Sequence, residues 1–423
     1  MNSTLKIAVV GGGAAGFFAA ISAKEHHPSA EVTIYEKSNK VLAKVKVSGG
    51  GRCNVTHACF DNKELSNFYP RGKNQLRKAF EQFNAQSTID WFKKRGVELE
   101  TLHDNCIFPK SNSSQTIIDC FEYEAKRLGI SVQIQTPIND IRFEDGLFVL
   151  KSLEQEILVD RVIYTTGGQP KADSLRWVEK FGHTLIQPVP SLFTFNMPNE
   201  PIRSLMGIVV EPALVRVEKT KLEADGPLLV THWGMSGPAI LKLSAFGARI
   251  LAENNYDFAV LVNWLHTKKE DELRQELERV KETNADKKIS NYNPFGLSSR
   301  LWEYLVEKSA ISVDARWKEV TGKAFNKLVN TLLNDRYEVK GKTTFKEEFV
   351  TAGGIALDGV DFKTMESRHQ PGLFFAGEVL DVDGVTGGFN FQAAWSTGWI
   401  AGKVPSRASG TVTRDEVTSD VFD

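Results

Sequence analysis

The sequence predicts an α/β fold in which a domain built on a parallel sheet is interrupted by an inserted segment. A short apolar run at residues 7–10 passes directly into a glycine-rich turn, and a second apolar run at 32–35 ends in an acidic residue. A further buried-strand run with glycine turns returns only at 373–376, after a middle zone of different composition. Because nucleotide-type strands belong to one sheet, we expect that middle zone to be inserted into a single domain.

The N-terminal turn carries the spacing G-x-G-x-x-G at Gly11, Gly13 and Gly16, with Ala14 and Ala15 before the last glycine. The first glycine permits the tight strand-to-helix turn, and the second lets backbone amides approach a pyrophosphate. The third lets the helix pack on the strand. These features are typical of a Rossmann-like unit.

The second apolar run ends in Glu36, twenty residues after Gly16. An acidic side chain at this point accepts hydrogen bonds from an adenosine ribose. A lone glycine fingerprint is a weak signal, since a tight turn alone would explain it. With strand, helix, second strand and acid in register, the sequence predicts a dinucleotide site.

Length and composition describe an ordinary globular chain of two or three domains, with 423 residues, 41% hydrophobic and 25% charged. The net charge of −1 argues against nucleic acid as the main partner, although it leaves room for a local basic patch. The four cysteines include no C-x-x-C pair, so we expect no metal site. The chain shows no signal peptide and no apolar stretch of membrane-spanning length, which favours a cytoplasmic enzyme.

Three zones follow along the chain. The first, 1–190, has a mixed pattern: an amphipathic helix is expected at 77–95, and strands at 130–135, 141–143, 147–150 and 161–166. Asp145 and Gly146 predict a hairpin between two of these strands. The second zone, 191–345, is β-rich over 191–265, with strands expected at 192–195, 208–210, 214–217, 228–231 and 258–262.

The rest of the middle zone, 266–345, is charged and is expected to be helical, above all at 270–287 and 299–309, with a break at 291–294. The third zone, 346–405, returns to a strand at 373–376, glycine turns, and an apolar helix at 391–401. A polar tail, 406–423, closes the chain.

Four motifs stand out beside the fingerprint. A second glycine loop, S-G-G-G-R-C-N, covers 48–54, and T-H-W-G-M-S-G-P covers 231–238. Near the C-terminus come G-E-V-L-D at 377–381 and G-G-F-N at 387–390. In this order, over residues 5 to about 403, the chain resembles the BaiN/YhiN-like family of FAD-dependent flavoproteins.

The resemblance implies a glutathione-reductase-like FAD-binding domain in two segments, residues 1–190 and residues 346–405, split by an inserted substrate domain at 191–345. It also implies tightly but noncovalently bound FAD. Relatives are assigned to different reactions, including reduction of an enone in bile-acid-like steroids and oxidation of small amino-ketones. The family therefore indicates the cofactor far better than the substrate.

A long cofactor such as FAD requires residues distant in sequence to converge. The fingerprint is expected to take the pyrophosphate and Glu36 the ribose, and the N-terminus of the last helix to stabilise negative charge on reduced flavin. The full set of expected cofactor residues is Gly11, Gly13, Ala14, Ala15, Gly16, Glu36, Lys37, Lys44, Ser48, Gly50, Gly51, Arg52, Asn54, Ile138, Thr166, Gly167, Gly168, Gly377, Glu378, Asp383, Gly387, Gly388, Phe389, Asn390 and Phe391.

Two residues are candidates for catalysis. Arg52 is placed either to hold an anionic flavin or substrate or to form a structural ion pair. His232 either protonates substrate or is a structural histidine. Cys53 fits a buried packing thiol better than a redox group. The serine of 231–238 is no hydrolase nucleophile, because Pro238 occupies the second glycine position of G-x-S-x-G; a helix cap explains it better.

Three functions remain open. The first is an FAD-dependent oxidoreductase that transfers hydride between flavin and a small enone, ketone or amine, with NAD(P)H as a transient reductant or O₂ as the second partner. The second is an NAD(P)-dependent dehydrogenase without flavin. The third is a protein that binds FAD without turnover. The sequence does not indicate the oligomeric state.

Overall fold

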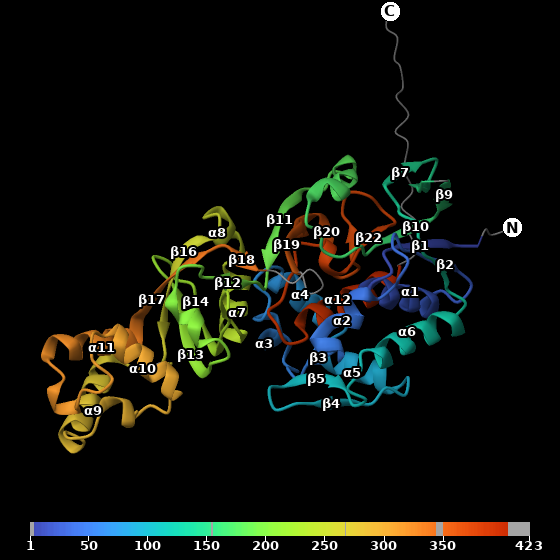
Figure 1. Cartoon of the computed structure of the whole chain (residues 1–423). Helices are drawn as coiled ribbons and strands as arrows, with labels where there is room; N and C mark the ends of the chain where they lie inside the picture. Colours follow the sequence, from blue (N-terminus) through green and yellow to red (C-terminus); the bar gives the residue numbers. More distant parts are fainter. Residues whose placement is uncertain (1–3, 154, 267, 344–349, 405–423) are drawn as a thin grey trace, which may run out of the picture.

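The computed structural model describes residues 4–153, 155–266, 268–343 and 350–404. They form two bodies, each with its own sheet and hydrophobic core (Figure 1). The α/β class expected from the sequence is confirmed, while the polar tail at 406–423 lies outside the described residues. No helix among the described residues is long and apolar enough to cross a membrane.

The first body contains a seven-stranded sheet in the order β20-β21-β22-β10-β1-β2-β6. Its strands are β1 (Lys6–Val10), β2 (Glu31–Tyr35), β6 (Ser131–Gln133), β10 (Arg161–Tyr164), β20 (Val360–Asp361), β21 (Glu366–Ser367) and β22 (Leu373–Phe375). Strand β1 pairs in parallel with β2 and β10, and β10 pairs in parallel with β22. The chain therefore returns to the first sheet after the middle zone, and the carboxyl ends of β1, β2, β10 and β22 lie at one edge.

Helices α1 (Ala14–His26) and α12 (Phe389–Gly402) pack against each other beside this sheet. A Cβ at Gly398 would lie 2.7 Å from the carbonyl oxygen of Ala15, so glycine permits the close approach. The other helices of this body are α2 (Ala43–Gly51), α3 (Asn62–Ser66), α4 (Lys73–Phe80), α5 (Ala85–Lys93) and α6 (Gln115–Arg127). Its small sheets comprise β3 (Thr56–His57), β4 (Leu99–Thr101) and β5 (Cys106–Pro109), and β7 (Asp140–Glu144), β8 (Leu147–Lys151) and β9 (Glu156–Val159).

The second body holds a sheet in the order β17-β16-β13-β14-β15-β12-β18. Its strands are β12 (Thr194–Asn196), β13 (Val209–Val217), β14 (Glu223–Val230), β15 (Gly234–Ser236), β16 (Asp257–Asn263), β17 (Asp335–Lys340) and β18 (Lys342–Thr343). Its helices are α7 (Pro238–Phe246), α8 (Ala248–Glu253), α9 (Glu270–Thr283), α10 (Ser299–Lys308) and α11 (Gly322–Asn334). Figure 1 shows α9, α10 and α11 at the end of the molecule away from the first sheet.

Two strands join the bodies. The chain leaves the first body through β11 (Leu185–Ser191) and returns through β19 (Val350–Ile355), and the two pair antiparallel. A 3₁₀ helix at Ala172–Phe181 precedes β11, and another at Gly377–Val379 follows β22. The returning strand β19 contacts Glu378, one of the residues that the sequence assigns to the cofactor, through the N–H of Thr351.

Several local expectations are corrected. The helix expected at 77–95 is two helices: α4 ends at Phe80, and Asn84 caps the start of α5 by accepting a hydrogen bond from the N–H of Ser87 at 3.1 Å. The strands expected at 208–210 and 214–217 are one strand, β13, with a bulge between Val210 and Ala213. Helix α9 ends at Thr283, well before the break expected at 291–294. The predicted hairpin at Asp145 and Gly146 is confirmed.

The charged stretch 266–345, expected to be helical, also contributes β17 and β18 to the second sheet. In β17, three buried residues alternate with partly or fully exposed ones, which is the period of a strand with one face on the core. The outward positions of β17 are charged, so the alternation of buried and exposed residues was not recognised in a segment assigned as helical from its charge.

Candidate cofactor and substrate site

A cavity of about 750 Å³ lies at the carboxyl ends of β1, β2 and β10. It reaches the start of α12 and the facing edge of the second body. The expected cofactor residues that line it are Gly11, Gly13, Ala14, Ala15, Glu36, Lys37, Lys44, Ser48, Asn54, Ile138, Thr166, Gly167, Gly377, Glu378, Gly387, Gly388, Asn390 and Phe391. The expected residues that lie outside this lining are Gly16, Gly50, Gly51, Arg52, Gly168, Asp383, Phe389 and His232.

The three fingerprint glycines differ in what surrounds them. A Cβ at Gly16 would collide with the carbonyl oxygen of Gly11, and a Cβ at Gly11 would lie 2.6 Å from the carbonyl oxygen of Thr165. Both positions require glycine because protein segments approach closely. A Cβ at Gly13 would meet no protein atom within 4 Å, and Gly13 lines the cavity. The space beside Gly13 is therefore open to a ligand.

Glu36 is fixed at the end of β2 by two backbone donors. Its Oε2 accepts a hydrogen bond from the N–H of Gly12 at 2.8 Å, and its Oε1 accepts one from the N–H of Ser38 at 2.9 Å. The carboxylate is thus oriented before any ligand arrives, and it lines the cavity. Each oxygen retains acceptor capacity for a ribose hydroxyl.

The second glycine loop, 48–54, has an unusual backbone. Gly49, Gly50 and Gly51 have φ of 57°, 68° and 83°, a left-handed run that side chains disfavour. Ser48 and Gly49 line the cavity, and the Ser48 hydroxyl donates to the carbonyl oxygen of Val45 at 2.8 Å. The loop therefore presents backbone, rather than long side chains, to the cavity.

Arg52 and Cys53 have structural contacts. The Arg52 guanidinium lies 4.4 Å from the centre of the Phe108 ring and donates to the carbonyl oxygen of Gly49 at 3.2 Å. Burial raises the pKa of the Cys53 thiol to about 12, which fits the packing interpretation. Arg52 thus holds the glycine loop in shape and does not line the cavity.

Glu378 closes the cavity near the end of β22. It accepts a hydrogen bond from Lys44 Nζ at 2.9 Å and another from the N–H of Thr351 at 2.9 Å. A Cβ at Gly168 would lie 2.5 Å from Glu378 Oε1, so glycine there makes room for the acid. The acid thus joins the segment before the second glycine loop to β19, the strand that returns from the second body.

The N-terminus of α12 also faces the cavity, through Gly387, Gly388 and Asn390. Gly388 caps this helix with φ of 90°, and a Cβ there would lie 2.6 Å from Asn54 Oδ1. The first turn of α12 contains no acidic side chain, so the positive end of the helix dipole is not neutralised locally.

The cavity offers what FAD, the cofactor implied by the resemblance, requires. The open space at Gly13 suits a pyrophosphate, and Glu36 suits a ribose. Thr166 also lines the cavity, beside Gly167 and Tyr164 at the end of β10. The residues present therefore fit the group.

The second body closes the far end of the cavity with residues that the sequence did not single out as lining. They are Leu192, Thr194, Ser236 and Leu241. The hydroxyl of Ser236, at the end of β15, makes no hydrogen bond within the described part of the chain. His232 lies four residues earlier on the exposed surface, where its ring contacts Trp233 at 4.2 Å between centroids. The 231–238 turn thus reaches the cavity through its serine and not its histidine.

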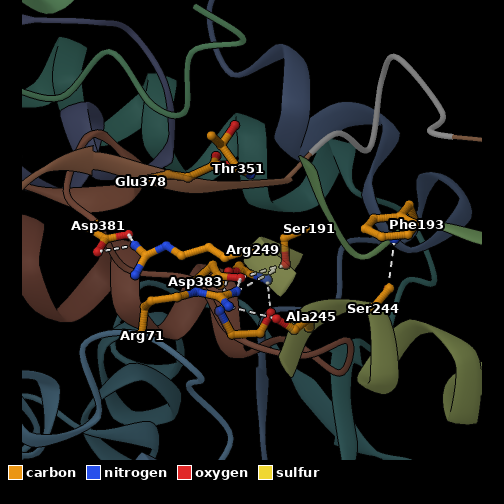
Figure 2. A network of polar contacts seen from close by, with 12 residues as sticks. Arg71, Ser191, Phe193, Ser244, Ala245, Arg249, Thr351, Glu378, Asp381 and Asp383 are labelled. Carbon is orange, nitrogen blue, oxygen red and sulfur yellow. Dashed lines mark hydrogen bonds and ion pairs between the residues drawn. The ribbon is translucent and has the colours of Figure 1, made fainter. Parts of the chain in front are cut away.

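Asp383 belongs to a buried network instead of the cavity lining (Figure 2). It forms a two-point ion pair with Arg71 and accepts a hydrogen bond from Ser191 Oγ at 2.6 Å. Arg71 also donates to the carbonyl oxygen of Ala245 in α7 at 2.7 Å. Burial raises the pKa of Asp383, against the opposing effect of Arg71. No local sequence pattern reveals this pair, because 312 positions separate its members.

A glycine cradle and an oriented acid at the ends of parallel strands define a nucleotide site, and the long cavity beyond them reaches a second body. The protein is by class a flavin-dependent oxidoreductase. The chain belongs to the family described as HI0933-like protein Rossmann domain, whose model matches residues 5–404. The resemblance read from the motifs is thereby confirmed.

Relatives align over nearly their whole length. The 3-dehydro-bile acid delta(4,6)-reductase of Clostridium scindens is 26% identical over 410 residues, 94% of this chain and 98% of the relative. The ribosomal RNA dihydrouridine synthase of Escherichia coli is 27% identical over 400 residues, 92% of this chain and 95% of the relative. Among solved structures, 3-ketosteroid-delta4-(5alpha)-dehydrogenase from Rhodococcus jostii aligns with TM-score 0.48 and 12% identity, covering 95% of this chain and 98% of that one.

Proposed function

We propose that the protein is an FAD-dependent reductase that saturates a carbon–carbon double bond conjugated to a carbonyl group. The observation that carries the proposal is the single cavity that joins the Gly13 and Glu36 end to the wall formed by the second body. A cofactor held along that cavity would have its reactive end at the wall, where a substrate can be enclosed.

The names of the relatives support this chemistry. The words delta(4,6)-reductase and 3-dehydro-bile acid describe reduction of double bonds in a steroid that carries a ketone. The words dihydrouridine synthase describe saturation of the uracil ring. In both cases the bond reduced is conjugated to a carbonyl, although the substrates differ greatly in size and charge.

Different residues of this chain would bind the cofactor and the substrate. The backbone around Gly13, with Glu36 and Thr166, would bind the pyrophosphate and ribose. When bound and reduced by NAD(P)H, FAD would supply a hydride to one carbon of the double bond, and water would supply the proton to the other. The N-terminus of α12 favours negative charge nearby, and the Ser236 hydroxyl is placed to donate a hydrogen bond to the substrate carbonyl oxygen, where charge develops. The second body would exclude water from this end, as expected of an inserted substrate domain at 191–345.

The electron source belongs to the proposal as well. We expect NAD(P)H to act as a transient reductant, because the sequence contains no second fingerprint for a dedicated NAD(P) domain; O₂ is the other partner considered. The four free cysteines suit a reducing compartment, in keeping with the proposed cytoplasmic location.

The test begins with the purified protein and its visible spectrum. We expect a yellow protein that releases FAD on acid precipitation; a colourless, well-folded protein supplied with FAD during expression would instead favour the NAD(P)-dependent dehydrogenase. The flavin is then reduced anaerobically with NADH or NADPH. A 4-en-3-one steroid and cyclohex-2-enone are each expected to reoxidise it, and cyclohexanone is not. Reoxidation by none of them would contradict the proposal and favour FAD binding without turnover.

A nucleic-acid substrate is a second candidate, favoured by the names of the Escherichia coli and Haemophilus influenzae relatives. The expectation that nucleic acid is not the main partner therefore stays a prediction. Ribosomal RNA lacking dihydrouridine serves as a further arm of the same assay. Reoxidation by this RNA and not by the enones would replace the small-molecule proposal.

A further inference from the structure

Leu192 adopts a backbone conformation that its side chain disfavours. Its φ is 54°, in the left-handed region, between the end of β11 and the start of β12. A branched residue in this region costs on the order of 1–3 kcal/mol, and such outliers gather at binding sites. Leu192 lines the cavity at the crossing from the first body into the second.

The residues on both sides of Leu192 are fixed by hydrogen bonds (Figure 2). On one side, Ser191 Oγ donates to Asp383 Oδ2 at 2.6 Å. On the other, the N–H of Phe193 donates to Ser244 Oγ at 2.9 Å. Both neighbours are buried, Ser191 and Phe193 each at 1% exposure. The strained peptide is therefore held from two directions and cannot relax alone.

We call the two hydrogen bonds of Ser191 and Phe193 the clamp. On the Ser191 side, its acceptor Asp383 is held by a buried ion pair. Arg71 precedes α4, Asp383 precedes α12, and Ala245 lies in α7 of the second body, so three distant segments meet. The side chains of Arg71 and Asp383 are 9% and 0% exposed. A buried ion pair is weak evidence of stabilisation, since apolar residues of similar size often serve as well. Here the pair specifies a geometry, because it fixes the serine next to Leu192.

We propose that Leu192 is a specificity-determining residue that contacts the substrate and aligns it at the reactive end of the cavity. Its partners in this wall are Leu241, Ser236 and Thr194. The Thr194 hydroxyl already donates to the carbonyl oxygen of Thr343 at 3.3 Å, so the wall offers a ligand two apolar side chains and the hydroxyl of Ser236. Such a surface suits an uncharged ring system with one hydrogen-bond acceptor, the chemistry of a cyclic enone. The inference rests on the proposed function and narrows its substrate to this class.

The hydrogen bonds on both sides of Leu192 hold its backbone in the left-handed region, although glycine would adopt this conformation with less strain. Glycine would remove the strain and also the side chain, and alanine would remove most of the side chain and keep the strain. Comparing Leu192→Gly with Leu192→Ala therefore separates the effect of backbone strain from the effect of losing the side-chain contact with the substrate. Lys219→Gly is the matched control, because Lys219 has φ of 62° on an exposed turn between β13 and β14.

The experiment measures three quantities on the FAD-loaded full chain: FAD content, melting temperature, and the dissociation constant of a 4-en-3-one steroid from the change it causes in the flavin spectrum. Lys219→Gly should raise the melting temperature by roughly 1–3 °C through relief of strain, and Leu192→Gly should melt above Leu192→Ala, because both lose the packing of the leucine against the core and only glycine relieves the strain. Leu192→Ala should not raise it. Both Leu192 variants should retain FAD and weaken steroid binding at least tenfold, while Lys219→Gly binds like the wild type.

Each other result has a distinct meaning. Steroid binding at wild-type affinity in both Leu192 variants would overturn the assignment of Leu192 and leave the proposed function standing. Loss of FAD from both would also overturn it, making Leu192 a cofactor contact. A wild-type protein that holds FAD yet neither binds nor reduces any enone would overturn the proposed function and this inference with it.

Discussion

The two ends of the cavity are built in different ways. The nucleotide end consists of backbone, glycine and one acid, contributed by neighbouring strand ends and oriented by short-range hydrogen bonds. The wall at the second body consists of side chains, and the position of one of them, Leu192, depends on an ion pair and a hydrogen bond between residues far apart in the chain. The first end suits a cofactor of constant shape, and the second can change with the substrate without disturbing the first.

Gly13→Val is expected to have the largest effect at the nucleotide end. Its Cβ would meet no protein atom, so the chain should fold, but the side chain would occupy the space of the pyrophosphate. We expect no measurable FAD after gel filtration and an apo-protein melting temperature like that of wild-type apo-protein. Gly16→Val is the contrast, because its Cβ collides with Gly11 and should prevent folding. Stoichiometric FAD in Gly13→Val would show that the pyrophosphate lies elsewhere.

Arg71→Met tests the other end. It leaves Asp383 buried without its partner, which should cost about 3–5 kcal/mol of unfolding free energy. Arg249→Met is the matched variant: Arg249 pairs with Asp381 at 2.6 Å and is 42% exposed, while Asp381 is 12% exposed, so water reaches this pair and its loss should cost less, about 1–2 kcal/mol. Urea denaturation of both variants measures the difference. Equal costs would contradict the claim that the Arg71 pair is the anchor of the wall.

The same contrast explains how much of the molecule the sequence predicts. The fingerprint, Glu36 and the G-E-V-L-D turn are local patterns, and most of the residues they indicate do line the cavity. Leu192 falls at the start of an expected strand, but the strand begins at Thr194 because the clamp on Ser191 and Phe193 forces a turn. Contacts of this kind depend on tertiary structure, and no spacing rule in one sequence contains them.

Glu36→Ala returns to the nucleotide end with a smaller effect. It removes a charged acceptor from the proposed ribose site and frees the N–H groups of Gly12 and Ser38, so FAD should bind about 3 kcal/mol more weakly. Isothermal titration of apo-protein with FAD measures this. The affinity of Glu36→Gln for FAD should lie between those of the wild type and Glu36→Ala, because the amide side chain keeps one acceptor oxygen. Unchanged affinity in Glu36→Ala would remove Glu36 from the cofactor site.

Glu124, a buried carboxylate within the first body, differs from Asp383 in the direction of its pKa shift: the pKa of Glu124 is lowered and that of Asp383 is raised. The hydrogen bond from Arg127 lowers the pKa of Glu124, and Arg95 adds to this effect, although burial opposes both. A lowered pKa stabilises the fold above the ordinary glutamate pKa of about 4.3, and that contribution is lost as the pH falls through the lowered value. Glu124→Gln should therefore be about 2 kcal/mol less stable than wild type at pH 7, and this difference should be smaller at pH 3. A constant difference at both pH values would contradict the assigned ion pairs.

The smallest expected effect decides which residue of the 231–238 turn meets the substrate. Ser236 lines the cavity and His232 lies on the exposed surface, although the sequence made His232 the candidate. Ser236→Ala should lower the rate of flavin reoxidation by a 4-en-3-one steroid about tenfold, or about 1.4 kcal/mol in the barrier, through loss of a donor at the developing oxyanion. Ser236→Thr, which keeps a hydroxyl, should recover some of the rate. His232→Asn should leave both FAD content and reoxidation within about twofold of wild type, because a side chain outside the cavity contributes little to the barrier. A tenfold loss in His232→Asn with FAD retained would restore the histidine to catalysis and require the turn to rearrange when substrate binds.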